Sequence, residues 1–265
     1  MADLILPDLF EHLDKTWSSS VTFYMDVYLL GGKSSLSYYD IQPVQPVPQS
    51  TNHHYSLTYK EATKVNLENT IINVIKKSDK NDVVIFAFSG HGYKYSDRHE
   101  QGICLDDTDM SDTNIRDLFK NFALDTQTSD IYYKSSLLYF FDSCYSGGLV
   151  EAMDIYAKKN AYFIGAVPAT AESTSGNPLS ILGHKFHSSL SIHGITTMAF
   201  MEQFWNSDEN TWDFSQFDIN LESFISVFIT HSEQNQYQDD DTPIVGNAPV
   251  VIDGDTDEEF YINLS

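Results

Sequence analysis

Apolar residues along the chain follow two patterns, one typical of buried strands and the other of amphipathic helices. The run VVIFAF at 83–88 is continuous, as expected of a strand that is covered on both faces. Other runs of strand length predict strands at 21–30, 136–141, 161–167 and 259–264. Apolar positions at helical spacing predict helices at 61–77, 113–122, 195–205 and 221–235, with a short helix closing at 153–158.

Strands and helices alternate along the sequence, which is typical of a mostly parallel sheet between two helical layers. We therefore predict an α/β fold, a three-layer sandwich whose sheet is flanked by helices. No internal repeat and no clear linker divides the chain, so residues 1–265 are expected to form a single domain. Residues 33–57 are rich in Ser, Pro, Gln and Tyr and predict a loop, and 89–112 predicts a Gly- and Asp-rich connection.

Charge and composition narrow the classes of function. The 15 Lys and Arg residues against 38 Asp and Glu give a net charge of −23, which argues against nucleic acid as a partner. The same charge suits basic peptides or divalent cations, although it also serves solubility. No stretch approaches the roughly 18 apolar residues of a membrane span, and the N-terminus lacks the features of a signal peptide. Two cysteines make no disulfide framework, so a reducing, cytoplasmic location is expected.

Two of the predicted strands are followed directly by residues with reactive side chains. The strand at 83–88 runs into Ser89-Gly90-His91-Gly92, and the strand at 136–141 runs into Asp142-Ser143-Cys144. If these strands are neighbours, the imidazole and the thiol project from the same sheet edge. A histidine there stabilises a thiolate nucleophile and later protonates a leaving amine.

The glycines near these residues fit the same chemistry. Gly92 follows the histidine, and Gly147-Gly148 follow the cysteine, where a missing side chain lets the backbone approach a substrate closely. The backbone N–H groups of Gly92 and Cys144 are the predicted oxyanion hole.

The motif FSGHG, followed 53 residues later by DSCYSGG, resembles the caspase–hemoglobinase superfamily of cysteine peptidases. Within it, the chain is most similar to metacaspases and bacterial caspase-like peptidases, with Tyr145 where their motif has His. The resemblance extends over roughly 58–170 and is weak elsewhere. It implies a largely parallel six-stranded sheet and a cysteine endopeptidase that acts through a thioester acyl-enzyme, with His91 and Cys144 as the dyad and no required cofactor.

The resemblance also implies a substrate preference. The metacaspase aspartate that matches Asp142 lines the pocket for the residue before the scissile bond, and a carboxylate there prefers Arg or Lys. Ser89 is a minor candidate for the same pocket. The alternative role of Asp142 is to cap a turn. The second pocket aspartate of the family stays unassigned between Asp26 and Asp40.

Many metacaspases bind activating calcium, and CLDDTDMSD at 104–112 lies in the matching region. The candidate ligands are Asp106, Asp107, Asp109 and Asp112, with Glu151 seven residues beyond Cys144. A solvated acidic loop is the alternative interpretation.

Two other functions stay open. A legumain-like or transamidase-type acyl transfer uses the same fold, and ATAESTS at 169–175 is similar to the legumain strand end. A non-catalytic caspase-like scaffold is the other.

Several other histidines and the remaining cysteine are predicted to have no catalytic or metal-binding role. His53 and His54 are predicted to be surface histidines, Cys104 a buried free thiol, and His184 and His187 no zinc site. Processing sites at Lys134, Lys158-Lys159 and Lys185 are undecided, as are the oligomeric state and the physiological substrate.

Overall fold

The computed structural model describes most of the first two thirds of the chain. The described residues are 2–31, 46–79, 81–95, 100–120, 135–154, 161–170 and 172, and the short strands β9 (Ser175–Gly176), β10 (His193–Gly194), β11 (Trp205–Asn206), β12 (Thr211–Trp212) and β13 (Val250–Asp253). The predicted helix at 221–235 and strand at 259–264 lie outside them, and of the helix at 195–205 only Trp205 is described, as part of β11. No helix in the described segments is long and apolar enough to cross a membrane.

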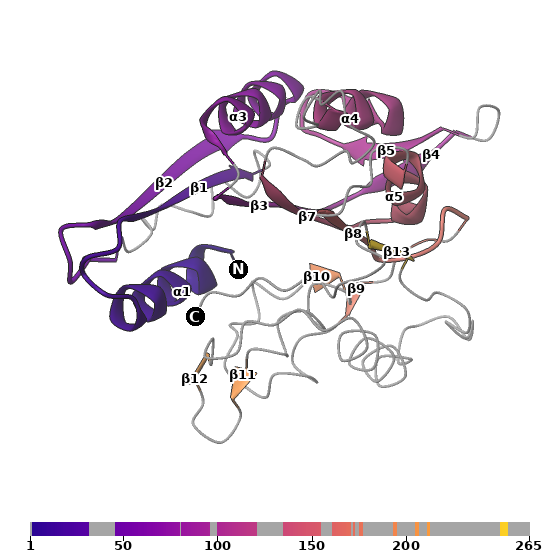
Figure 1. The fold of residues 1–265 in the computed structure, drawn as a ribbon. Helices are drawn as coiled ribbons and strands as arrows, with labels where there is room; N and C mark the ends of the chain where they lie inside the picture. Colours follow the sequence, from indigo (N-terminus) through magenta and orange to yellow (C-terminus); the bar gives the residue numbers. More distant parts are fainter. Residues whose placement is uncertain are drawn as a thin grey trace.

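The strands form a mostly parallel arrangement with helices on both sides (Figure 1). Four strands are hydrogen-bonded in the order β13-β8-β7-β3, where β3 is Val83–Ser89, β7 Ser136–Asp142 and β8 Ala161–Gly165. β1 (Phe23–Gly31) and β2 (His53–Glu61) form a separate parallel pair. The predicted α/β class is therefore confirmed. The resemblance implies one six-stranded sheet. Among the described residues, however, the corresponding strands form two separate sheets, the pair β1-β2 and the four strands β13-β8-β7-β3.

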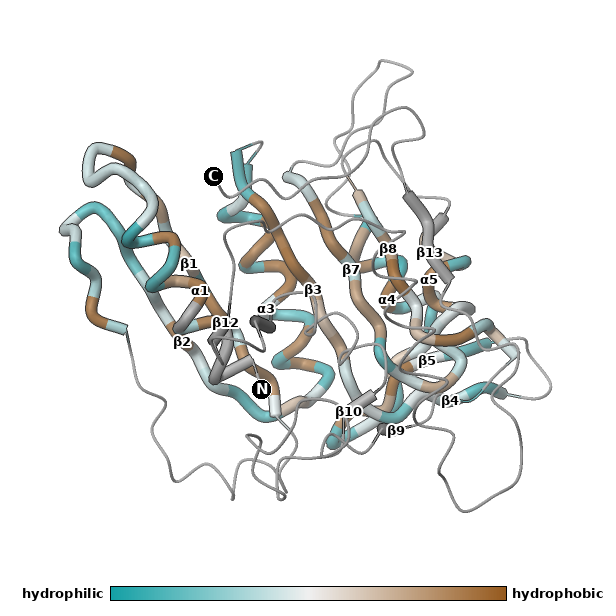
Figure 2. The backbone as a smooth tube through the Cα atoms, turned by 90° about the horizontal axis from the view of Figure 1, so that it is seen from below, coloured by the Kyte–Doolittle hydropathy of each residue, from teal (hydrophilic) through white to brown (hydrophobic). Residues whose placement is uncertain are grey.

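Three helices cover one face of the four-stranded sheet: α3 (Lys64–Lys77), α4 (Asp112–Phe119) and α5 (Ser146–Asp154). Alternate residues of β7 point into the core beneath them, and Tyr139 is among the most buried. The Tyr139 ring stacks on Phe163 of β8 at 4.8 Å and lies 4.2 Å from Phe119 of α4, measured between centroids. Such aromatic pairs contribute about 1 kcal/mol each beyond burial, so they hold α4 against the sheet. Figure 2 shows the hydrophobic residues along β3, β7 and β8.

β3 is the edge strand of the four-stranded sheet, and the described residues cover only one of its faces. Val84, Phe86 and Phe88 pack against the core, whereas Val83 and Ile85 are 46% and 48% exposed. The prediction of a strand covered on both faces was wrong for 83–88. It holds for β7 and β8, whose residues from Leu137 to Asp142 and from Ala161 to Gly165 are all buried.

Three local assignments also differ from the sequence prediction. β2 falls at the end of the expected loop, and its register with β1 is continuous from Phe23–His53 to Gly31–Glu61. The expected connection at 89–112 contains a three-stranded antiparallel sheet, β4 (Gly92–Lys94), β5 (Gln101–Cys104) and β6 (Asp109–Ser111). α5 begins two residues after Cys144, well before the short helix predicted at 153–158. These elements are too short or too polar for hydrophobic periodicity to reveal them.

The N-terminal helix α1 (Ala2–Thr16) packs on the side of β1 and β2 opposite α3 (Figure 1). A buried side-chain hydrogen bond joins them: His53 Nδ1 lies 2.7 Å from Asp14 Oδ1, and the two side chains are 0% and 2% exposed. Asp14 Oδ2 accepts from the backbone amide of Gln49 at 2.6 Å. His53 is 1% exposed and packs on Phe23, with 4.5 Å between the ring centroids. The prediction of a surface histidine was therefore wrong for His53. Its partner is 39 residues away, beyond the reach of any local pattern.

We predict that Asp14→Ala lowers the free energy of unfolding by about 3 kcal/mol at pH 7, because it leaves His53 buried without its carboxylate. Burial raises the pKa of Asp14, but hydrogen bonds from Gln49 and His53 outweigh it and hold that pKa below its ordinary value. The contribution is therefore present at neutral pH and is lost as the pH falls below about 4. Urea unfolding of wild type and variant between pH 7 and pH 3 measures it.

Asp26→Asn is the matched control, because it breaks a largely exposed pair with Lys77 (3.1 Å) and should cost less than about 1 kcal/mol. If the two variants lose the same free energy of unfolding, the buried contact of Asp14 with His53 contributes no more than an exposed ion pair.

Candidate active site

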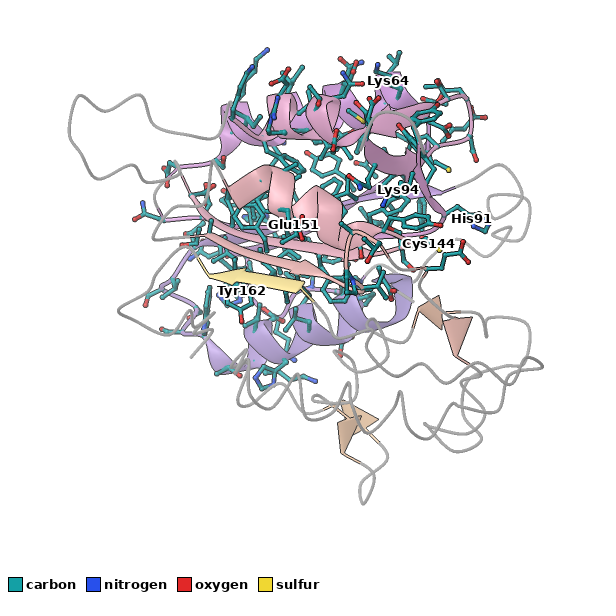
Figure 3. The ribbon with its side chains drawn as sticks, turned by 90° about the vertical axis from the view of Figure 1, so that its right-hand side faces the viewer. Lys64, His91, Lys94, Cys144, Glu151 and Tyr162 are labelled. Atoms are coloured by element: carbon teal, nitrogen blue, oxygen red, sulfur yellow. The ribbon has the colours of Figure 1, made fainter. Side chains whose placement is uncertain are left out.

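The site lies where β3 and β7 leave the sheet side by side. The register pairs Ser89 with Asp142, and the Gly90 amide donates to the Asp142 carbonyl at 3.2 Å. His91 and Cys144 each follow this pair by two residues. Parallel strands that end in register deliver their next residues to the same edge, and Figure 3 shows His91 and Cys144 together at one end of the molecule.

Gly92 makes the approach of the two segments possible. A Cβ atom at this position would lie 2.0 Å from the Cys144 carbonyl oxygen and 3.1 Å from Ser143 Oγ. No side chain fits there, so only glycine lets the strand after His91 lie against the backbone of the cysteine turn.

The turn after Cys144 is strained and tightly bonded. Tyr145 has φ 58°, the one positive value outside glycine in the described chain. This left-handed conformation costs about 1 to 2 kcal/mol for a residue with a side chain. Three hydrogen bonds hold the turn: Gly148 N to Tyr145 O (3.0 Å), Gly147 N to Val167 O (2.7 Å) and Val167 N to the buried Ser146 Oγ (3.2 Å).

The glycines after the cysteine serve packing within the protein. A Cβ at Gly147 would lie 2.6 Å from the Val167 carbonyl oxygen, and a Cβ at Gly148 would lie 2.5 Å from the side chain of Gln101. Their role in letting the backbone approach a substrate closely stays a prediction. They let α5 start immediately against the end of β8.

One contact beside the cysteine escaped the sequence analysis. The Tyr145 hydroxyl donates to Glu172 Oε1 at 2.8 Å, which ties the cysteine turn to the segment after β8. That hydrogen bond, then burial and negative charge, raise the pKa of Tyr145. The one signal in the sequence was Tyr145 itself, which stands where the related motif has His.

Cys104 is a free thiol, as predicted, and is partly buried. Its backbone amide donates to the His91 carbonyl at 2.9 Å. Burial, a hydrogen bond with Asp109 and the negative charges nearby raise the pKa of Cys104 to about 11. Its thiol is therefore protonated at neutral pH and is a poor nucleophile.

Asp142 and Ser89, the two predicted pocket residues, occupy paired positions on neighbouring strands. Side chains at paired positions of parallel strands lie on the same face of the sheet. For Asp142 this is the face opposite α3, α4 and α5, since the alternate residues Leu137, Tyr139 and Phe141 point into the core. Asp142 is 3% exposed, whereas Ser89 is exposed.

The proposed calcium ligands have separate roles in the structure. Asp107 Oδ1 accepts from the Lys64 amide at 2.9 Å and so caps α3, and Asp112 Oδ1 accepts from the amide of Thr113. Glu151 lies on α5, well away from Lys64 in Figure 3. In the segments that the structure describes, no group of three or more His, Cys, Asp or Glu side chains is arranged to hold a metal ion. Calcium binding stays a prediction, and these residues do not fit a preformed site.

The remaining candidate residues lie apart from the paired ends of β3 and β7 or outside the described residues. His54 stacks on the exposed Tyr24 at 4.6 Å between ring centroids. The Asp26 carboxylate accepts hydrogen bonds from the side chains of Lys77 and Ser56. Asp40, Lys134, Lys158, Lys159, His184, Lys185 and His187 lie outside the described residues.

Comparison with known proteins agrees with the motifs. The family model described as metacaspase, peptidase C14 domain, matches residues 35–153, the segment that carries both His91 and Cys144. The predicted resemblance to the caspase–hemoglobinase superfamily is therefore confirmed, and the match supports an enzyme of the cysteine-protease type. No curated protein matches the chain. Among solved structures, the crystal structure of protein GSU0716 from Geobacter sulfurreducens is 14% identical, with a TM-score of 0.44, over 76% of this chain and 77% of that one.

We predict that Gly92→Ala disrupts the site, because the added methyl group would meet backbone rather than a movable side chain. Overpacking of this kind costs about 1 to 3 kcal/mol, and the backbone shift would displace His91 from Cys144. Thermal unfolding and peptidase assays together measure both effects.

Gly90→Ala is the matched control, since its Cβ would meet only the end of the Phe88 ring, at 2.9 Å. A larger loss of stability in Gly90→Ala than in Gly92→Ala would contradict the packing explanation.

Proposed function

We propose that this chain, whose residues 35–153 match a metacaspase peptidase C14 domain, is a cysteine endopeptidase with Cys144 as nucleophile and His91 as general base and acid. The observation that carries the proposal is the matched exit of β3 and β7, which brings both residues to one sheet edge. Intact histidine and cysteine at this edge favour an enzyme over a non-catalytic scaffold.

In the proposed reaction, His91 takes the thiol proton of Cys144, and Sγ attacks the carbonyl carbon of the scissile peptide bond. The tetrahedral intermediate collapses as the C–N bond breaks, and His91 gives its proton to the leaving amine. A water molecule then loses a proton to His91 and attacks the thioester. The acid product leaves and the proton returns to Sγ, so the enzyme is regenerated.

The ladder of β4 and β5 supports Gly92 as an oxyanion donor. Since the Cys104 amide donates to the His91 carbonyl, His91 and Cys104 form a hydrogen-bonded antiparallel pair. Successive N–H groups along a strand point to opposite sides, so the N–H of Gly92 points away from β5. The Gly92 N–H therefore makes no hydrogen bond to β5. The α-carbon of Gly92 lies against the Cys144 carbonyl. An oxyanion formed at Cys144 would lie near this donor.

Charge supports a basic residue before the scissile bond. Asp142 precedes the thiol by two residues and shares a sheet face with Ser89. Glu172 adds a second carboxylate beside the cysteine turn. In a chain with net charge −23, carboxylates at this edge favour Arg or Lys and disfavour acidic substrates.

The dyad predicts that Cys144→Ala and His91→Ala each lower the hydrolysis of fluorogenic peptides by roughly six orders of magnitude, which is loss of detectable turnover. Peptides ending in Arg, Lys, Asn or Asp, each with calcium and with a chelator, are the substrates. Cleavage after Asn would instead indicate legumain-like specificity. Cys104→Ala is the matched control, because a thiol with a raised pKa is not expected to act as nucleophile, and unchanged turnover in Cys144→Ala would exclude the mechanism.

For Asp142→Asn we expect kcat/KM after Arg and Lys to fall roughly tenfold, because the substitution removes charge while nearly preserving shape. Asp117→Asn on α4, which breaks a surface pair with Lys120, is the control. If Asp142→Asn mainly lowers the melting temperature and leaves the ratio of Arg to Ala cleavage intact, Asp142 is structural.

A further inference from the structure

The strand that follows His91 carries two tyrosines on the same side as the imidazole. His91, Tyr93 and Tyr95 pair with Cys104, Gly102 and Glu100 at alternate positions of the ladder, so the three side chains share one face. His91 is exposed, Tyr95 is 46% exposed and Tyr93 is half-buried. This face therefore leads outward from the proposed catalytic residue.

The other face of β4 is turned toward the protein. Gly92 contacts the Cys144 carbonyl, and the Lys94 ammonium donates to the carbonyl oxygen of Ala169 at 3.4 Å. Because these contacts anchor β4 to the turns after β7 and β8, the orientation of the two tyrosines relative to His91 is fixed.

The two rings are also held by their neighbours. A Cβ at Gly102 of β5 would lie 2.4 Å from ring atoms of Tyr93, so this glycine provides the space in which the Tyr93 ring lies. Tyr95 meets Tyr93 edge to face, with 4.9 Å between centroids and 68° between planes. An aromatic surface held in this way loses little entropy when it binds a ligand.

Several acidic residues lie on or beside the strands next to the two tyrosines. Glu100 lies opposite Tyr95, whose amide donates to the Glu100 carbonyl at 2.9 Å. Asp109 pairs with Cys104, which in turn pairs with His91. Burial raises the pKa of Tyr93, and electrostatic interactions with Tyr95, Glu100, Asp109 and Asp112 raise it further. Aromatic rings with adjacent carboxylates bind the cationic side chains of Lys and Arg.

The proposed reaction decides which part of a substrate passes over this face. His91 protonates the leaving amine, which belongs to the residue after the scissile bond. The C-terminal part of the substrate must therefore leave the site on the His91 side. An extended strand rises about 3.3 Å per residue, so Tyr93 and Tyr95 lie about 7 and 13 Å along it from His91. These spans match the second and fourth residues after the bond.

We propose that the face defined by Tyr93, Tyr95, Glu100 and Asp109, here named the tyrosine face, binds the substrate segment C-terminal to the scissile bond and selects Lys or Arg in it. This inference rests on the proposed function. It adds a second basic preference, separate from the one assigned to Asp142.

The test uses internally quenched peptides that share one N-terminal half ending in Arg and carry Lys, Ala or Glu at the second to fourth positions after it. A coumarin amide with the same N-terminal half has no such residues. For the wild type, we expect kcat/KM for the Lys peptide to exceed that for the Glu peptide roughly tenfold, and the ratio to fall with added salt. Tyr95→Ala and the isosteric Glu100→Gln should each lower the ratio roughly threefold.

Tyr24→Ala is the matched control, because Tyr24 is 69% exposed on β1, in the separate two-stranded sheet, and should leave the ratio unchanged. Cleavage of the coumarin amide with equal rates for the Lys and Glu peptides would overturn the inference and leave the proposed function standing. The same holds if Tyr95→Ala and Glu100→Gln, both folded by circular dichroism, keep the wild-type ratio. Failure to cleave any of these substrates would instead overturn the proposed function, and the inference with it.

Discussion

The site depends on the close contact between the backbones of Gly92 and Cys144. The parallel register of β3 and β7 brings the two segments to one sheet edge, but it does not set their distance beyond the last paired residues. The absence of a side chain at Gly92 does, because the space for its Cβ is occupied by the Cys144 carbonyl oxygen. A general base and a nucleophile accelerate a reaction most when their relative position is fixed before the substrate binds. Packing of backbone against backbone achieves this with fewer movable groups than side-chain contacts.

Strain and bonding around the cysteine act together. Tyr145 adopts a left-handed conformation that is unfavourable by itself, and the hydrogen bonds of Ser146, Gly147 and Gly148 compensate for it. The strained residue therefore lies directly between the proposed nucleophile and the start of α5. Such strain persists only where the surroundings enforce it, which is typical of sites that must present one side chain in a set orientation.

The sequence was informative where hydrophobic pattern and motif coincide. The strands β3, β7 and β8 and the placement of His91 and Cys144 at their ends follow from apolar runs that stop at polar residues. Position in the sheet is not encoded locally, so the exposed face of β3 was missed. The Asp14–His53 pair and the Tyr145–Glu172 bond join residues 39 and 27 positions apart, and no spacing rule predicts them. The tyrosine face depends on β4, a three-residue strand hidden in a polar stretch.

The pairing of β1 with β2 separates the unit that folds from the segment that the family model matches. β1 lies before residue 35, yet it is hydrogen-bonded to β2 along its whole length. β8 lies after residue 153 and is the sheet neighbour of β7, and Val167, just beyond β8, supplies the carbonyl that accepts from the Gly147 amide. A fragment cut at 35 and 153 would expose two strand edges and leave His53 without Asp14. Fragments made for expression or crystallisation should therefore keep α1 at one end and extend beyond β8 at the other.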